Sequence, residues 1–247
     1  MDAGSVRAWK IDQVLPIVPQ LSAVLRDAII RGDLAPGQRI SESEIATLCH
    51  VSRQPVREAF IHLSTEGLLE IRPQRGTIVS KIDFVTVLDA RFLREAIEAD
   101  IVSILASNAD PKLVQELRAQ IKAQYAAVDA SEFMRLDEDF HHTLADAADK
   151  RGAWKLIQGL KSQMDRVRFL SLDNFQVRHL IAQHERVVDC IFESDQQGAN
   201  RAIRTHLRAI LADLPNVIAE YPESFHRPEG DLPFPLNAPM QPEGGQL

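Results

Sequence analysis

The sequence predicts a mainly α-helical protein with an N-terminal domain over residues 17–80 and a C-terminal antiparallel all-helical bundle over residues 83–214. Three observations support this class. With 247 residues and 45% apolar content, the chain is long enough to bury two cores. Signals for strands and tight turns occur only before Ser80, and helical periodicity takes over beyond it. The remaining segments are an N-terminal extension over residues 1–16 and a Pro/Gly-rich tail over residues 221–247, which is predicted to be mobile.

Two helices are expected at the start of the N-terminal domain. Apolar residues recur at helical spacing over residues 21–29 and predict an amphipathic helix that ends before a Gly-containing turn. Ser41 and Glu44 match the Ser-x-x-Glu capping box, which predicts a short helix over residues 42–48. The side chains expected to face inward from this short helix are Ile45 and Leu48.

A third helix follows the short helix after a three-residue turn. Ser52 is a suitable N-cap and Pro55 lies in the first turn, so the helix is expected to start at about Arg53. Its buried stripe is predicted to consist of Val56, Phe60 and Leu63. Its polar face carries Arg53, Gln54 and Arg57, which are side chains suited to reading bases in a major groove. The stretch alone fits an ordinary amphipathic surface helix equally well.

The segment after this helix predicts a wing. Gly67 ends the helix, and residues 68–72 and 77–79 are expected to form two strands joined by a turn. Arg75 and Gly76 at the tip place a cation beside a residue without a side chain, which suits close approach to a phosphate or a minor groove. Residues 17–80 therefore predict a winged helix-turn-helix.

These motifs resemble the GntR family of bacterial transcription regulators. The family pattern V-S-R-x-P-V-R-E-A is matched from Val51 to Ala59, and E-G-L is matched from Glu66 to Leu68. Gln54 departs from the threonine that is commonest at that position in the family, which leaves the base preference open. The resemblance implies contacts with an operator in double-stranded DNA from Ser52, Arg53, Gln54, Arg57, Arg75 and Gly76.

Charge and cysteine content limit the possible classes of protein. The formal net charge is −7, but residues 1–80 carry nine Lys/Arg and nine Asp/Glu, so the N-terminal domain is neutral. A neutral module can bind DNA when its cations are clustered, with help from dimerisation. Cys49 and Cys190 form no disulfide framework and no Cys-x-x-Cys clip. The sequence contains no signal peptide or membrane-spanning run, which predicts a cytoplasmic protein with no membrane partner.

The second half of the chain predicts six helices. The interruptions lie at residues 110–111, 130–131, 152, 172–174 and 194–195. Asp110 and Ser131 are expected N-caps, and Pro111 fits the first helical position.

Four side chains in this half predict a divalent metal site. Asp137 and His141 are four residues apart and therefore share one helix face, while His184 and His206 lie on two later helices. One carboxylate and three imidazoles suit zinc, nickel or manganese, with positions left for water or an oxygen ligand. Taken one at a time, each histidine fits a surface or hydrogen-bonded residue better than a metal ligand.

The second half also resembles the FCD domain, the helical ligand-binding domain of the FadR subgroup of GntR regulators. The signature of that domain is an Asp-x-x-x-His pair followed by one histidine on each of the last two helices. Asp137, His141, His184 and His206 fill the four places. The resemblance implies a metal and a small carboxylate effector, because a long-chain acyl-CoA binder of the subgroup lacks these ligands.

Two arginines are candidates for binding the effector. The family pattern places an arginine four residues before a glutamate on the first helix of this domain, and Arg94 with Glu98 fits. The resemblance implies that Arg94 binds a carboxylate through its paired donors, whereas the residues alone favour a surface salt bridge with Glu98. Arg168 is a second candidate. Residues 51–82 resemble regulators encoded beside sugar-acid dehydratase and dehydrogenase genes, so hexonates are the first effectors expected.

Together these features predict a ligand-responsive regulator that acts as a repressor. A homodimer formed through the helical domains would present two recognition helices to a pseudo-palindromic operator. The first alternative is a metal-dependent enzyme, but no nucleophile or general base stands at recognisable spacing. The second alternative, a DNA-binding dimer without an effector, leaves the four metal ligands unexplained.

Overall fold

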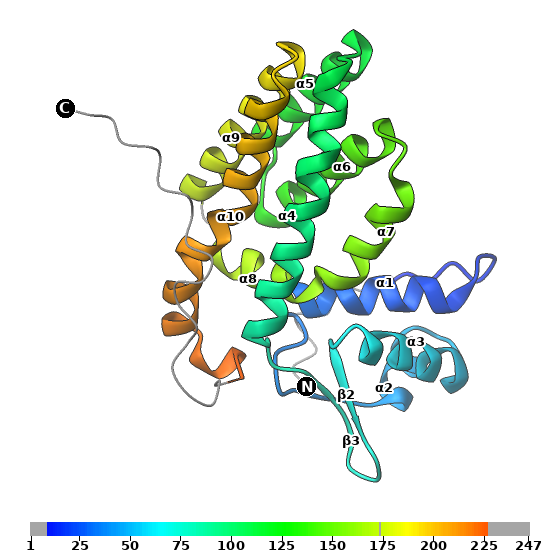
Figure 1. The fold of residues 1–247 in the computed structure, drawn as a ribbon. Helices are drawn as coiled ribbons and strands as arrows, with labels where there is room; N and C mark the ends of the chain where they lie inside the picture. The colour runs from blue at the N-terminus through cyan, green and yellow to red at the C-terminus, as the bar shows by residue number, and fades with distance from the viewer. Residues whose placement is uncertain (1–8, 173, 227–247) are drawn as a thin grey trace.

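The computed structural model describes residues 9–172 and 174–226. Within them the N-terminal domain contains three helices and a three-stranded antiparallel sheet of order β1-β3-β2 (Figure 1). The elements are α1 (Ile17–Ile30), β1 (Arg39–Ile40), α2 (Glu42–Leu48), α3 (Arg53–Thr65), β2 (Leu69–Arg72) and β3 (Gly76–Val79). In the sheet, Leu69 pairs with Val79 and Arg39 pairs with Ile78. The sequence did not predict β1, because two residues are too few to show alternation.

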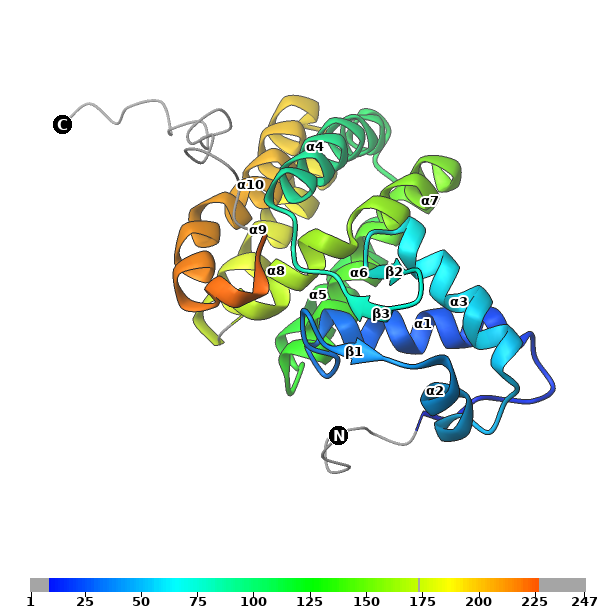
Figure 2. The same ribbon diagram turned by 90° about the horizontal axis from the view of Figure 1, so that it is seen from below.

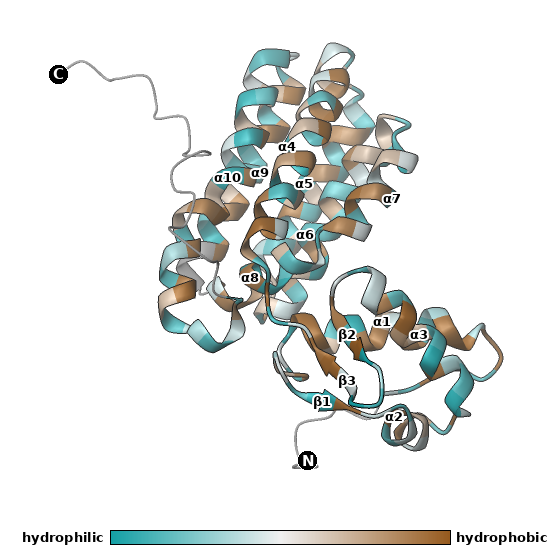
Figure 3. Ribbon diagram, turned by 60° about the horizontal axis from the view of Figure 1, so that its bottom comes forward, coloured by the Kyte–Doolittle hydropathy of each residue, from teal (hydrophilic) through white to brown (hydrophobic). Residues whose placement is uncertain are grey.

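One apolar core holds α3 against α1. Leu21 and Leu25 of α1 lie in the same buried cluster as Val56, Phe60 and Leu63 of α3, and none of the five is more than 1% exposed. Figure 3 shows α1 and β3 largely in the brown of apolar residues. Because complete burial of such a side chain contributes about 1.5–3 kcal/mol, the predicted stripe determines which face of α3 remains outside.

Two local predictions about α2 and α3 are wrong. Leu48 is 40% exposed, because the turn after α2 buries Cys49 in its place. Ser41 and Ser52 stand at the N-cap positions, but neither side chain accepts a hydrogen bond from the first turn. The Ser41 hydroxyl instead bonds the Ser43 hydroxyl at 2.7 Å, so the capping box does not form.

The C-terminal bundle contains seven described helices rather than six. They are α4 (Phe84–Ser107), α5 (Pro111–Tyr125), α6 (Ala130–Ala147), α7 (Arg151–Leu160), α8 (Ser162–Ser171), α9 (Asn174–Phe192) and α10 (Gln196–Glu220). The additional break falls at Lys161, two residues after Gly159, and the Lys161 ammonium group binds Glu138 at 2.8 Å. No described helix is long and apolar enough to cross a membrane.

The helix boundaries follow their predicted caps in part. Asp110 caps α5 as expected, accepting a bond from the Lys112 amide at 2.9 Å. The cap of α6 is Asp129 and not Ser131, because the Asp129 carboxylate accepts from the Glu132 amide at 2.8 Å. Helix α10 continues through Pro215 and so extends beyond the expected end at Leu214.

The two domains meet at α8. Figures 1 and 2 place α4 along the outside of the bundle and the N-terminal domain at one end of it. Helix α8 packs against α1. The Gln163 side-chain amide donates to the Gly67 carbonyl, immediately after the recognition helix, at 2.8 Å. One helix of the bundle therefore contacts the DNA-binding domain directly.

The start of the predicted tail is ordered. Residues 222–224 form a short 3-10 helix, and the Ile82 amide donates to the Ser224 carbonyl at 2.8 Å. Phe225 is 3% exposed and packs in a cluster with Ile82 and Phe84. The prediction of a mobile tail is therefore wrong for residues 221–226. Residues 227–247 of that predicted tail and residues 1–8 of the N-terminal extension lie outside the described residues.

Phe225→Ala is expected to lower the free energy of unfolding by about 3 kcal/mol, because truncation of a buried phenylalanine leaves a cavity. Chemical denaturation of the whole chain measures the change. Phe192→Ala is the matched control, because Phe192 is 59% exposed. Equal destabilisation by the two variants would contradict the packing of Phe225 against Ile82 and Phe84.

Candidate nucleic-acid interface and metal centre

The predicted base-reading side chains all lie on the exposed side of α3. Ser52, Arg53, Gln54 and Arg57 are exposed, and the opposite side of the helix is buried. The Arg53 side chain is 70% exposed and forms an ion pair with Glu42, at 3.3 Å. Gln54 donates to Glu58 at 3.0 Å on the same surface. Exposed pairs of this kind contribute little to stability, so the side chains are free to reorient towards a groove.

The wing tip has the predicted composition and an additional cation. Arg75 and Gly76 are both exposed, and Gly76 has φ 88°, which favours glycine. Arg39 of β1 donates to the Arg75 carbonyl at 2.7 Å and is itself exposed. Arg39 could not be predicted from the sequence, because only the pairing of β1 with β3 brings it to the wing.

The four predicted metal ligands converge in the middle of the bundle. Asp137 and His141 project from α6, His184 from α9 and His206 from α10, and one ligand atom of each lies within 4.8 Å of the others. None of the four is more than 4% exposed. His141 Nε2 and His184 Nε2 each lie 3.2 Å from His206 Nε2, while Asp137 Oδ1 lies 3.5 Å from His184 Nε2.

Hydrogen bonds on the other ring nitrogen orient each imidazole. His141 Nδ1 donates to Glu98, at 2.5 Å, and His184 Nδ1 donates to Gln124 Oε1, at 2.8 Å. His206 Nδ1 donates to Gln183 Oε1 at 3.1 Å. Protons on all three Nδ1 atoms leave three Nε2 lone pairs directed at one another, which is unfavourable unless a cation lies between them. The donor set therefore fits a divalent metal.

The electrostatics of the site favour the metal-binding protonation states. Burial lowers the pKa of His184 to about 3 and that of His206 well below its usual value. Burial alone would raise the pKa of Asp137, but the charge and the hydrogen bonds of Arg168 hold it well below its usual range. Neutral imidazoles and an ionised carboxylate are the forms that bind metal.

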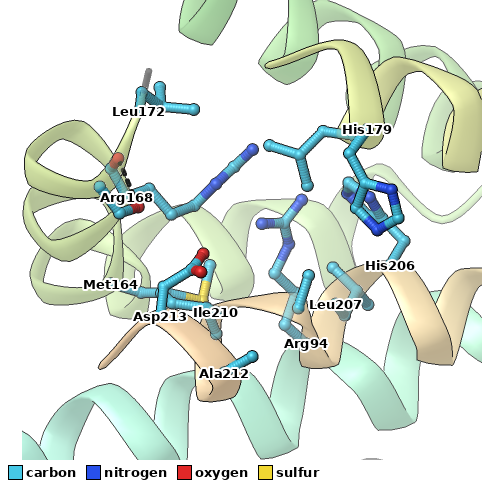
Figure 4. Close-up of a pocket in the computed structure, with 13 residues that line it drawn as sticks. Arg94, Met164, Arg168, Leu172, His179, His206, Leu207, Ile210, Ala212 and Asp213 are labelled. Atoms are coloured by element: carbon cyan, nitrogen blue, oxygen red, sulfur yellow. Dashed lines mark hydrogen bonds between the residues drawn. The ribbon is translucent and has the colours of Figure 1, made fainter. Parts of the chain in front are cut away.

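The two predicted effector-binding arginines line one cavity beside the metal ligands. The cavity has a volume of about 330 Å³ and is also lined by His206 and by apolar side chains of α8 and α10. Figure 4 shows Arg94 and Arg168 with their guanidinium groups directed into this space. The exposed His179 lies at the same cavity.

Arg94 does not form the surface salt bridge that its spacing suggests. It is 2% exposed, and its Nε donates to Glu98, which also accepts from His141. Its Nη2 is buried and has no hydrogen-bond partner among the described residues. A buried unpaired guanidinium donor is costly, so this atom is suited to an anionic group in the cavity.

Arg168 has a further role that its position in the sequence did not reveal. Its Nη1 and Nη2 each donate to one oxygen of Asp137 at 2.8 Å, which makes a bidentate contact with a metal ligand. The sequence likewise did not predict which residues orient the histidines, namely Glu98, Gln124 and Gln183. No spacing rule identifies them, because each bond joins two different helices.

Comparison with known proteins agrees with both halves of the structure. Residues 18–79 match the model for "Bacterial regulatory proteins, gntR family", and residues 89–209 match the model for the FCD domain. An HTH-type regulator of Streptomyces ambofaciens is 38% identical over 215 residues, which are 86% of this chain and 91% of that protein. The transcriptional repressor RspR of Escherichia coli K12 is 34% identical over 220 residues, which are 87% of this chain and 96% of that protein.

A solved structure shows the same fold. E. coli McbR/YncC superimposes with a TM-score of 0.69 at 17% identity, over 84% of this chain and 99% of that one. Two domain matches in the expected order and extensive identity to regulators establish the family. The chain belongs to the GntR family of bacterial regulatory proteins and is a DNA-binding transcriptional regulator with an FCD domain, not an enzyme.

Proposed function

We propose that this regulator, a member of the FadR subgroup, binds a divalent metal and a small carboxylate in its helical domain and responds to that carboxylate by changing its affinity for DNA. One observation carries the proposal. Three imidazole Nε2 atoms and Asp137 converge beside a cavity into which Arg94 directs a buried, unpaired donor. Neither an effector-less scaffold nor a packed core has a use for that arrangement.

The metal would be held by Asp137, His141, His184 and His206. Zinc, nickel and manganese all accept such a donor set. Bound there, the metal would supply a Lewis-acidic anchor for an anionic oxygen. Glu98, Gln124 and Gln183 orient the histidines for this task through their Nδ1 atoms.

Arg94 and Arg168 would receive the carboxylate from the other side of the cavity. The free Nη2 of Arg94 is available without breaking a bond, whereas Arg168 already binds Asp137. Sugar acids, hexonates first, are the effectors to try, and their hydroxyl groups would meet Ser171 and His179 in the lining.

On the DNA side, Ser52, Arg53, Gln54 and Arg57 would read bases, and Arg75 with Gly76 would contact the backbone at the wing. A homodimer would match a pseudo-palindromic operator. We expect the protein to repress transcription, because the similar E. coli protein RspR is named a transcriptional repressor. Binding to chromosomal DNA would require the protein to be in the cytoplasm.

Arg94→Ala is expected to keep metal and operator binding but to lose the response to the effector. The reason is that Arg94 is not one of the four metal ligands and is joined to them through Glu98, so its truncation removes a contact with the carboxylate but leaves the metal donors in place. A ligand shifts an equilibrium only by its differential affinity for the two states. Gel-shift titrations with gluconate and other hexonates measure the response, and calorimetry measures binding of the same acids.

Arg91→Ala is the matched control for that variant. Arg91 is also buried on α4 and paired with a glutamate four residues later, but it does not line the cavity. An Arg94→Ala protein that responds at wild-type concentrations would remove Arg94 from the effector site. Metal-dependent turnover of the acids would instead favour the enzyme reading.

A further inference from the structure

Strand β1 places Arg39 on the outer surface of the wing. β1 is the edge strand of the sheet and pairs with β3, with Arg39 opposite Ile78. Successive side chains of a strand point to opposite faces. Ile40 is 6% exposed and belongs to the core, so Arg39 faces solvent. The burial of its neighbour therefore fixes the position of this arginine.

The Arg39 side chain reaches the tip of the wing. Its Nη2 donates a hydrogen bond to the Arg75 carbonyl, at 2.7 Å. Ile78, opposite Arg39, lies three residues after Arg75, so the arginine side chain runs along β3 towards the turn. Figure 2 shows β1 beside β3 and continuing into α2. Arg39 thus connects the wing tip to the strand that leads into the helix-turn-helix.

The turn at the tip has an unfavourable backbone conformation. The Arg75 amide donates to the Arg72 carbonyl at 3.0 Å, which closes a turn over residues 72–75. Gln74, the third residue of that turn, has φ 60°, a value that glycine or asparagine usually adopts. A residue held in this region persists only where surrounding contacts stabilise it. The bond from Arg39 to the carbonyl of the next residue is such a contact.

Two of the three arginines around this turn keep their charge available. Both oxygens of Glu70 accept hydrogen bonds from Arg72, at 2.8 and 2.9 Å, which compensates the Arg72 charge. Among the described residues, neither Arg39 nor Arg75 forms an ion pair within 4.0 Å. A guanidinium carries several N–H donors, so one bond to a carbonyl leaves Arg39 with others free. Arg39 and Arg75 therefore meet at the wing tip with unused donors and no counter-charge.

We propose that Arg39 positions the wing and, together with Arg75, binds one phosphate of the DNA backbone. Its bond to the Arg75 carbonyl holds the turn in the shape that presents Arg75 and Gly76 to the duplex, and its remaining donors face the same phosphate. The inference rests on the wing contact in the proposed function and adds a third residue to it. Because the two arginines act on one phosphate, loss of either should cost nearly as much affinity as loss of both.

The test is a double-mutant cycle on the full-length protein, with a specific and a scrambled duplex titrated at several KCl concentrations. Arg75→Ala should lower the slope of log affinity against log salt by about 1 per chain, the value for one phosphate contact. Arg39→Ala should lower it by the same amount on both duplexes, and the double variant should lower it no further. Both side chains are exposed, so the melting temperature should not change. Lys112→Ala, which removes an exposed cation at the start of α5, is the control and should keep the wild-type slope.

Arg39→Lys separates the shared contact from simple charge. Lysine keeps the cation but lacks the planar fork that can bind a carbonyl and a phosphate together, so it should recover only part of the lost affinity. The proposal is overturned if Arg39→Ala keeps the wild-type slope, if the double variant loses the sum of the two single effects, or if Arg39→Lys restores full affinity. An Arg75→Ala protein with the wild-type slope would remove the wing contact of the proposed function, and this inference with it.

Discussion

His184→Ala is expected to abolish retention of a divalent metal, whereas the wild-type protein should retain about one ion per chain through dialysis. His184 is fully buried and provides one of the three convergent Nε2 atoms. Chelation of the wild-type protein should lower its melting temperature, and restoring zinc, nickel or manganese should raise it again. Metal at about 100 times its dissociation constant would stabilise the fold by about 2.7 kcal/mol. Elemental analysis and thermal melts are the measurements.

His142→Ala is the control for this prediction. It removes a neighbouring histidine on α6 whose side chain is 50% exposed and pairs with Asp146. This variant should retain metal at the wild-type level. The site is disproved if purified wild type contains no metal and none of the three ions raises its melting temperature.

Arg53→Ala and Arg57→Ala are each expected to weaken binding to the specific operator by about 1 to 3 kcal/mol, the usual value of a good bidentate base contact. Both side chains lie on the exposed side of α3, opposite the core formed by Val56 and Phe60. Truncation there creates no cavity, so the fold and the metal content should not change. Fluorescence anisotropy with specific and scrambled duplexes separates loss of base reading from loss of charge.

Arg135→Ala removes an equally exposed arginine from the helical domain and should leave operator affinity unchanged.

Substitution of Arg75 at the wing should act differently from substitution of the α3 arginines. It should weaken specific and non-specific DNA similarly and reduce the salt dependence, because a phosphate contact carries no base information. Normal operator binding by a folded Arg57→Ala protein would disprove the recognition-helix assignment.

Much of the DNA-binding domain was predictable because its signals are local. Helices α2 and α3 begin where their N-cap serines predict, and the Gly67 turn follows α3 as expected. Helix period and turn chemistry act within a few residues, so a linear sequence records them directly. Local signals did not predict the features that depend on tertiary packing. Examples are the break at Lys161 between α7 and α8 and the exposure of Leu48.

The sequence by itself determined the family, the two domains and the identity of the four candidate metal ligands. Only the tertiary structure decided what surrounds those ligands. The Glu98, Gln124 and Gln183 bonds to the imidazoles each join two different helices, as does the Arg168 contact with Asp137. The spacing of Arg94 and Glu98 is the same on a solvated helix as on a buried one. Burial on α4 is what changes a weak surface pair into an oriented guanidinium with a free donor, because loss of water makes an unpaired polar atom costly.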